Sequence, residues 1–171
     1  MAEPKIKEKR WTIDLEKKIQ EEHFSGGPRY PFDPKSGKEI FVIDTPPPYP
    51  SGTWHIGAVA QYSMIDVIAR SPRMIGKEVY FPLGSDLNVI NLEFTVERKT
   101  GRKMKTYERA EFLDICRAEI EKYTQEMRNI AKRVGLSCAY DNEYLTDAPD
   151  YRAVTQSIFI DLFKRGDIVE E

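Results

Sequence analysis

The sequence has little of three features that would each point to a particular class of protein. Its 171 residues include two cysteines, Cys116 and Cys138, which are too far apart for a metal-binding pair and are expected to be reduced thiols. It contains no apolar run of about 18 residues, so no transmembrane helix is predicted. The net charge is −2, which excludes a global basic field for nucleic acid.

The charged N-terminus, Met1 to Arg10, lacks the apolar core of a secretory signal. The sequence also shows no internal repeat and no low-complexity tract. Because 40% of the residues are hydrophobic and 32% are charged, the composition is that of an ordinary globular protein with one real core. A cytoplasmic protein with no membrane partner is expected.

One stretch organises the rest of the sequence. Ile40 to Ile43 is a short run of β-branched and aromatic residues, which predicts a strand covered on both faces. Pro46 to Pro48 cannot continue a central strand, because each residue lacks the N–H of the ladder. Ser51 to Thr53 supplies a loop and a hydroxyl cap, and a helix is predicted over 55–74. His55 and Gly57 then lie in its first turn, where phosphate is attracted to free N–H groups.

A second strand is predicted from Glu78 to Pro82, parallel to the first and joined to it through the helix. Asp86 follows it, at the same edge as His55, so the two strand ends frame one pocket with an anionic side suited to an ammonium group. Two alternatives stay open: Asp86 could cap a turn, and His55 could only cap or pack at the helix start.

The remaining pattern predicts helices and loops around this unit. Amphipathic helices are expected over 11–24, over 106–134 with Thr106 as N-cap, and over 150–165 with residues 146–149 as its cap. The segment 137–144 is irregular, with at most a short strand. The basic segment 94–104 is predicted as a loop that either contacts an RNA backbone or is solvated surface. Packing on the sheet is predicted for Ile56, Val59, Ala60, Met64, Val67 and Ile68.

The segment from Pro46 to Ala58 resembles the PPP-x-x-(S/T)-G-x-x-H-x-G-H signature of class I aminoacyl-tRNA synthetases, and it looks closest to the valine-type members. Leu83 to Glu93 is similar to the family's G-x-D-x-x-G-L-P-x-E segment. The sequence departs from the family at Ala58, where a second His is usual, and at residues 89–91, which replace Gly-Leu-Pro. The resemblance covers about Ile40 to Glu171.

The resemblance implies the first half of a Rossmann-like (HUP-type) α/β parallel sheet over 39–171, preceded by a helical N-terminal extension over 1–38. It implies ATP with Mg²⁺, an amino acid (most simply valine) and the tRNA acceptor end as ligands, and no resident metal. His55 would be catalytic and hydrogen-bond the phosphates. The implied ATP-binding residues are Pro48, Tyr49, His55, Gly57 and Ala58, and the implied amino-acid-binding residues are Pro46, Pro47 and Asp86.

The family's K-R-G-x-(I/V)-(Y/V)-E run, which ends the first half of its catalytic fold, is matched by residues 164–170, and no Lys-Met-Ser-Lys-Ser string occurs. A lone chain is therefore expected to be an incomplete enzyme. Three alternatives remain open: a non-catalytic paralogue that binds ATP, tRNA or a synthetase; a split enzyme completed by a second chain; and a fragment of a longer protein. Isoleucine-type specificity is a further alternative.

Overall fold

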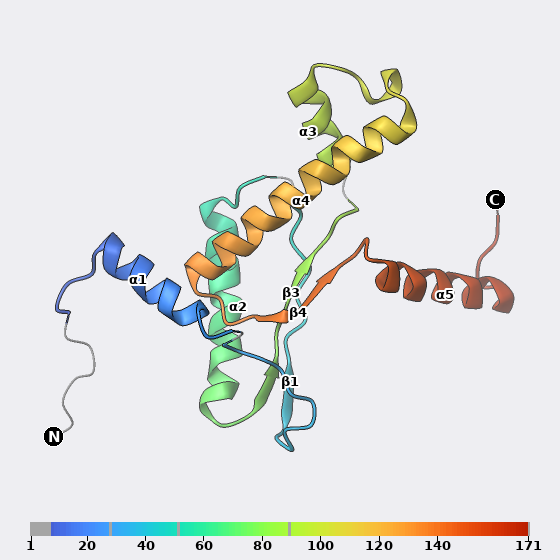
Figure 1. Ribbon diagram of the computed structural model, residues 1–171. Helices are drawn as coiled ribbons and strands as arrows, with labels where there is room; N and C mark the ends of the chain where they lie inside the picture. Colours follow the sequence, from blue (N-terminus) through green and yellow to red (C-terminus); the bar gives the residue numbers. More distant parts are fainter. Residues whose placement is uncertain (1–7, 28, 51, 89, 171) are drawn as a thin grey trace.

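The computed structural model describes residues 8–27, 29–50, 52–88 and 90–170 and has a mixed α/β fold (Figure 1). The elements are α1 (Ile13–Phe24), β1 (Ile40–Val42), α2 (Ile56–Met74), β2 (Glu78–Tyr80), β3 (Pro82–Ser85), α3 (Ile90–Thr100), the 3₁₀ turn η1 (Met104–Thr106), α4 (Arg109–Val134), β4 (Ala139–Leu145) and α5 (Pro149–Arg165). The predicted α/β class is confirmed.

The strands pair in parallel. β1 pairs with β2, with Ile40 opposite Glu78, and β3 pairs with β4, with Ser85 opposite Leu145. Only Phe81 separates β2 from β3, so they follow one path with β1 beside its first part and β4 beside its second. Each parallel pair needs a crossover, which α2 supplies for the first and α3 with α4 for the second.

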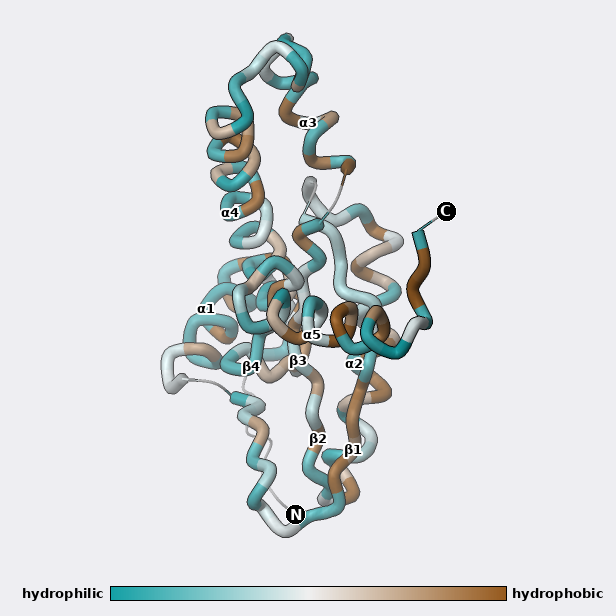
Figure 2. The backbone as a smooth tube through the Cα atoms, turned by 90° about the vertical axis from the view of Figure 1, so that its right-hand side faces the viewer, coloured by the Kyte–Doolittle hydropathy of each residue, from teal (hydrophilic) through white to brown (hydrophobic). Residues whose placement is uncertain are grey.

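The helices are arranged unevenly about the strands. In Figure 1, α1, α2 and α4 lie on one side, whereas α5 projects away on the other. The main core fills the space between α2, α4 and the strands, and consists of Ile43, Tyr62, Ala69, Val79, Phe81, Leu83, Ala131, Leu136 and Cys138. Figure 2 shows α3 and the adjoining part of α4 as a separate hairpin, which has its own small core of Leu92, Val96, Phe112 and Cys116.

A buried carboxylate joins α2 to the segment that follows α4. Asp66 Oδ1 accepts hydrogen bonds from the Ser137 N–H at 2.6 Å and the Ser137 hydroxyl at 2.5 Å, and its Oδ2 accepts one from Arg70 Nε at 2.6 Å. Asp66 is 6% exposed. Because a buried carboxylate is tolerated only when it is paired and hydrogen-bonded, this cluster fixes where α2 sits on the sheet.

Two predictions of burial were wrong. Ile40 and Val42 are 46% and 58% exposed, because β1 has a neighbouring strand on one side only and its outward face is uncovered in the described chain. On α2, the residues that are buried are Tyr62, Asp66, Ala69 and Pro72. Five of the six residues predicted to pack on the sheet are instead exposed, namely Ile56, Ala60, Met64, Val67 and Ile68, and Val59 is half-buried.

Three predicted boundaries also change. The segment 94–104 is not a loop, since α3 runs through it to Thr100. Helix α4 begins at Arg109 with Glu108 as N-cap, and Thr106 lies in the 3₁₀ turn. The irregular segment after α4 is a seven-residue strand, β4. The predicted helices over 11–24, 55–74 and 150–165 are present, with ends shifted by two residues at most.

The hairpin is basic, but three of its cations, Lys99, Arg102 and Lys103, have acidic partners in the described chain. Lys99 lies 2.5 Å from a Glu119 oxygen and Lys103 lies 3.0 Å from a Glu97 oxygen. These pairs favour the solvated-surface interpretation of the segment over phosphate binding. In the part of the chain that the structure describes, no helix is both long and apolar enough to cross a membrane.

Candidate functional site

The site predicted from the sequence lies where β1 and β3 end. His55 is the N-cap of α2, with extended backbone (φ −80°, ψ 164°), and its Nδ1 accepts a hydrogen bond from the Ala58 N–H at 3.2 Å. The helix is therefore capped by His55 itself, whereas the sequence placed His55 in the first turn and expected a hydroxyl cap. A neutral imidazole that accepts at Nδ1 carries its proton on Nε2. His55 thus presents an N–H donor at the exposed start of α2.

Gly57 allows this arrangement. A Cβ added at Gly57 would lie 3.0 Å from His55 Cε1 and 3.0 Å from Nδ1, so the imidazole occupies the space that a side chain would need. Within the described chain, the N–H groups of Ile56 and Gly57 have no protein acceptor. Free N–H groups at a helix N-terminus, beside a histidine donor, form a surface that suits an anion.

The proline loop is held at two carbonyls. The Tyr62 hydroxyl, from α2, donates to Pro46 O at 3.1 Å, and the Asp86 N–H, beyond β3, donates to Pro48 O at 3.0 Å. Burial raises the pKa of Tyr62 to about 12, so the phenol keeps the proton that it donates at neutral pH. Trp54 stacks on Tyr62 with ring centroids 4.7 Å apart and packs the loop against α2.

Asp86 is held by its neighbours and by one distant residue. Its Oδ1 accepts hydrogen bonds from the Asn88 N–H at 3.1 Å and from the Thr146 hydroxyl, beyond β4, at 2.9 Å. In the described chain no hydrogen bond reaches Oδ2. Asp86 does cap a local turn, as the alternative interpretation proposed, and it still has one carboxylate oxygen free for another partner.

The structure brings Asp86 against the proline loop through its hydrogen bond to Pro48, whereas Pro46 is held by Tyr62 of α2. His55 and Gly57 lie at the helix start that follows. His55 and Asp86 share no hydrogen bond in the described residues. Pro47 is half-buried, Tyr49 is exposed and Ala58 is half-buried. Ser51 and Val89 of the quoted motifs lie outside the described residues.

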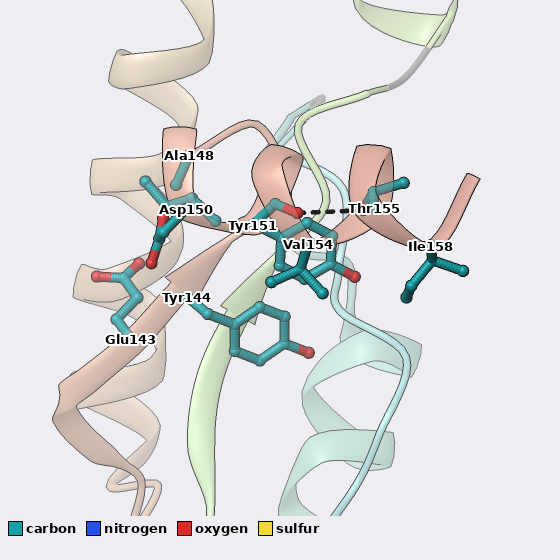
Figure 3. Close-up of a pocket in the computed structure, with 9 residues that line it drawn as sticks. Glu143, Tyr144, Ala148, Asp150, Tyr151, Val154, Thr155 and Ile158 are labelled. Atoms are coloured by element: carbon teal, nitrogen blue, oxygen red, sulfur yellow. Dashed lines mark hydrogen bonds between the residues drawn. The ribbon is translucent and has the colours of Figure 1, made fainter. Parts of the chain in front are cut away.

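The cavity in Figure 3, of about 570 Å³, contains none of the predicted site residues. It lies between β4 and α5, where the Tyr144 and Tyr151 rings stack with centroids 6.2 Å apart. Tyr144 crosses β3 at Gly84, where an added Cβ would come within 2.7 Å of the ring or closer. The cavity is bordered by the exposed apolar side chains of Val154 and Ile158, so it is part of the uncovered surface of α5.

Sequence reasoning missed Thr146, Tyr62 and Tyr144. Thr146 was expected to cap α5, but the N-cap is Ala148, without a side-chain hydrogen bond. Tyr62 could have been recognised as an aromatic residue with a polar tip on the side of α2 that faces the sheet. Gly84 was a weak signal for Tyr144, because a glycine inside a strand often marks the close approach of another group.

Comparison with known proteins identifies the family of the chain. The family model for tRNA synthetases class I (I, L, M and V) matches residues 29–171, so the chain belongs to this family of class I aminoacyl-tRNA synthetases. A solved structure of the LeuRS agnB2 from Agrobacterium radiobacter K84, in a ternary complex with tRNA and LeuAMS, is similar with a TM-score of 0.69 at 28% identity, over 88% of this chain and 17% of that one. The match confirms the predicted fold.

Among the curated relatives within the family are valine–tRNA ligases. The protein from Aeropyrum pernix is 41% identical over 98% of this chain and 21% of its own length. The protein from Nanoarchaeum equitans is 40% identical over 78% of this chain and 18% of its own length. The chain spans about a fifth of the length of these relatives. The division into an N-terminal extension and a catalytic half at residue 38 stays a prediction.

Proposed function

We propose that this chain carries the amino-acid-activating site of a valine-type class I aminoacyl-tRNA synthetase. In this reaction a carboxylate oxygen of the amino acid attacks the α-phosphorus of ATP, the bond to pyrophosphate breaks, and an aminoacyl adenylate forms. The aminoacyl group is then transferred to the tRNA 3′ end. One observation carries the proposal: the Asp86 N–H to Pro48 O hydrogen bond puts a carboxylate against the proline loop that leads into α2.

The residues divide the work by their chemistry. The His55 Nε2–H and the free N–H groups of α2 stabilise negative charge on the phosphates as the α-phosphorus is attacked. Gly57 leaves the space that keeps the imidazole in place and allows close approach of the adenosine. The free Oδ2 of Asp86 holds the ammonium group of the amino acid. Pro46 and Pro47 line the amino-acid pocket, and Pro48, Tyr49 and Ala58 line the ATP site.

ATP is a substrate here, and Mg²⁺ arrives with its phosphates. The described residues contain no group of three or more His, Cys, Asp or Glu side chains that could hold a metal ion. In this proposal the start of α2 receives the phosphates of the ATP–Mg²⁺ complex. Bound Mg²⁺ would neutralise phosphate charge. Catalysis by this chain therefore rests on positioning and on charge stabilisation.

The exposed apolar surface favours the presence of a partner that covers it. On α5 the side chains of Val154, Ile158, Phe159 and Phe163 are more than half exposed, and so is Val42 on β1. Uncovered strand edges and apolar faces are stable in solution only when they are small or covered. We propose that polypeptide corresponding to other parts of a synthetase covers this surface, in the same chain or in a second one.

The test is ATP–pyrophosphate exchange with purified chain and valine, isoleucine or leucine added separately. We expect exchange that depends on valine. Asp86→Asn should abolish it, and Asp114→Asn, at an exposed carboxylate on α4, should leave it unchanged. His55→Asn keeps a capping side chain but removes the imidazole donor, and should slow exchange by about 10²–10³-fold, as for a lost oxyanion donor. Valine and isoleucine differ by one methylene, so discrimination of about 10–200-fold is expected.

A non-catalytic role is the second candidate, and Ala58 favours it. The side chain of Ala58 has no donor where the family signature has a histidine, so one phosphate contact is missing. An accessory module would bind ATP in calorimetry without any amino-acid-dependent exchange. Exchange that requires valine and is lost in Asp86→Asn would exclude this role. Exchange that is the same with and without an added amino acid would contradict the first proposal.

A further inference from the structure

The Thr146 hydroxyl has its full complement of hydrogen bonds, and all of them go to the loop that carries Asp86. Its proton is donated to Asp86 Oδ1 at 2.9 Å. Its oxygen accepts from the Leu87 N–H at 2.9 Å and from Asn88 Nδ2 at 3.2 Å. A hydroxyl has one proton and two lone pairs, so no capacity is left over.

The backbone of Thr146 is fixed as well. Its N–H donates to Ser85 O at 3.1 Å, directly after the position where Leu145 pairs with Ser85 between β4 and β3. Thr146 is 9% exposed. A β-branched side chain at the end of a paired strand has little rotational freedom. The Thr146 hydroxyl is therefore held rigidly, and it fixes the loop that carries Asp86, a residue 60 positions earlier in the sequence.

The effect on Asp86 is directional. Two donors, the Asn88 N–H and the Thr146 hydroxyl, both act on Oδ1. They fix the rotation of the carboxyl group, so Oδ2 points in one direction. The Asp86 N–H bond to Pro48 O ties the same loop to the nucleotide side of the site. An ammonium group held by Oδ2 would then have a defined place relative to the proline loop.

From this geometry we infer that Thr146 is a positioning residue for the amino-acid substrate, acting through Asp86. The inference rests on the proposed function, because it needs Asp86 to bind the α-ammonium group. In the described chain Thr146 makes no hydrogen bond to the start of α2 or to His55. Its removal should therefore weaken the binding of the amino acid and leave ATP binding as it was.

The test compares Thr146→Val, which keeps the shape and removes the hydroxyl, with Thr146→Ser, which keeps the hydroxyl. The KM for valine and the KM for ATP are measured separately by pyrophosphate exchange. The Asn88 N–H still holds Oδ1 in Thr146→Val, so the loss is partial. We expect a valine KM raised about tenfold, the size expected for one hydrogen bond to a charged group, with the ATP KM within about twofold of wild type. Thr146→Ser should restore the valine KM.

A second readout needs no activity. Amide hydrogen exchange at Leu87 should speed up in Thr146→Val, because that N–H loses its acceptor, and should stay slow in Thr146→Ser. Thr100→Val, which removes a hydroxyl bonded to Val96 O on α3, is the matched control and should change neither measurement. Circular dichroism verifies that each variant is folded, and Thr146→Ala replaces the valine variant if that one is not.

The outcomes separate the two proposals. If the wild-type chain shows no valine-dependent exchange, the proposed function fails and the role of Thr146 fails with it. If the wild type is active but Thr146→Val raises both KM values alike, leaves both unchanged, or is not rescued by serine, the positioning role alone is overturned. Unfolding of both the valine and the alanine variants would show that Thr146 serves stability, and would also overturn it.

Discussion

Gly57→Ala tests whether the fold and the site can be separated at the start of α2. The new Cβ would lie 3.0 Å from two atoms of the His55 ring, closer than ordinary van der Waals contact, so the imidazole must move by a few tenths of an ångström. We expect this displacement to weaken its 3.2 Å hydrogen bond to the Ala58 N–H, and losing an N-cap completely costs about 1 kcal/mol. Alanine in place of glycine in a helix gains up to about 1 kcal/mol.

These two effects are of similar size and opposite sign. The free energy of unfolding of Gly57→Ala should therefore differ from wild type by less than about 1 kcal/mol, the size of either effect alone. The His55 Nε2–H, however, no longer points where it did. We expect the ATP affinity to fall about tenfold, which corresponds to the loss of one charge-assisted hydrogen bond.

Equilibrium unfolding in urea and calorimetric titration with ATP give the two quantities. Gly26→Ala is the control, because nothing lies within 4 Å of a Cβ added there, and it should change neither. His55→Asn should also keep its stability, since asparagine is a good N-cap, and lose ATP affinity. Wild-type ATP affinity in Gly57→Ala would refute the role of the ring. A loss of stability well above 2 kcal/mol would refute the balance of the two helix effects.

Three further predictions concern the fold. Asp66→Ala removes the buried carboxylate and should lower the free energy of unfolding in urea by about 3–5 kcal/mol. Asp114→Ala, at an exposed ion pair, should lower it by less than about 0.5 kcal/mol, and equal effects of the two variants would contradict the structural role of Asp66. Burial raises the pKa of Cys138 to about 12, so this thiol should resist maleimide at pH 7 until the protein unfolds; rapid native labelling would count against its burial. The Asp33 N–H lowers the pKa of Glu78, so its contribution to stability is present at neutral pH and is lost as the pH falls through that lowered pKa. Glu78→Gln should flatten that acidic part of the stability profile, and an unchanged profile would count against it.

The local parts of the fold could be predicted because they depend on neighbouring residues. The glycines at 76, 135 and 166 end α2, α4 and α5 with φ values of 88°, 79° and 79°, a conformation that side chains disfavour. As expected, β1 does not extend into the proline run, which lacks ladder donors. The family signature named His55, Gly57 and Asp86, and in the structure His55 and Gly57 follow β1 whereas Asp86 follows β3.

Burial could not be predicted in the same way, because it depends on what covers a face. The apolar residues of α2 suggested one packed stripe, but five of its six members are exposed. The helix meets the sheet through Ala69, which is fully buried and lets the backbones approach, and through Asp66, whose carboxylate is satisfied by Ser137. A polar residue at a core-facing position was the informative signal. The role of Asp66 can be recognised only when its partner, 71 residues later in the sequence, is known.

The same reasoning explains why the site was found only in part. Residues that touch a substrate can be recognised by a motif, since the motif and the chemistry lie in one stretch of sequence. Residues that orient them need only reach them in space. Thr146 precedes a proline at the start of a helix, which is the local pattern of a cap, yet its hydroxyl bonds entirely to residues 86–88. For a site at the ends of parallel strands, the support for one strand's residue therefore has to be sought at the end of the strand paired with it.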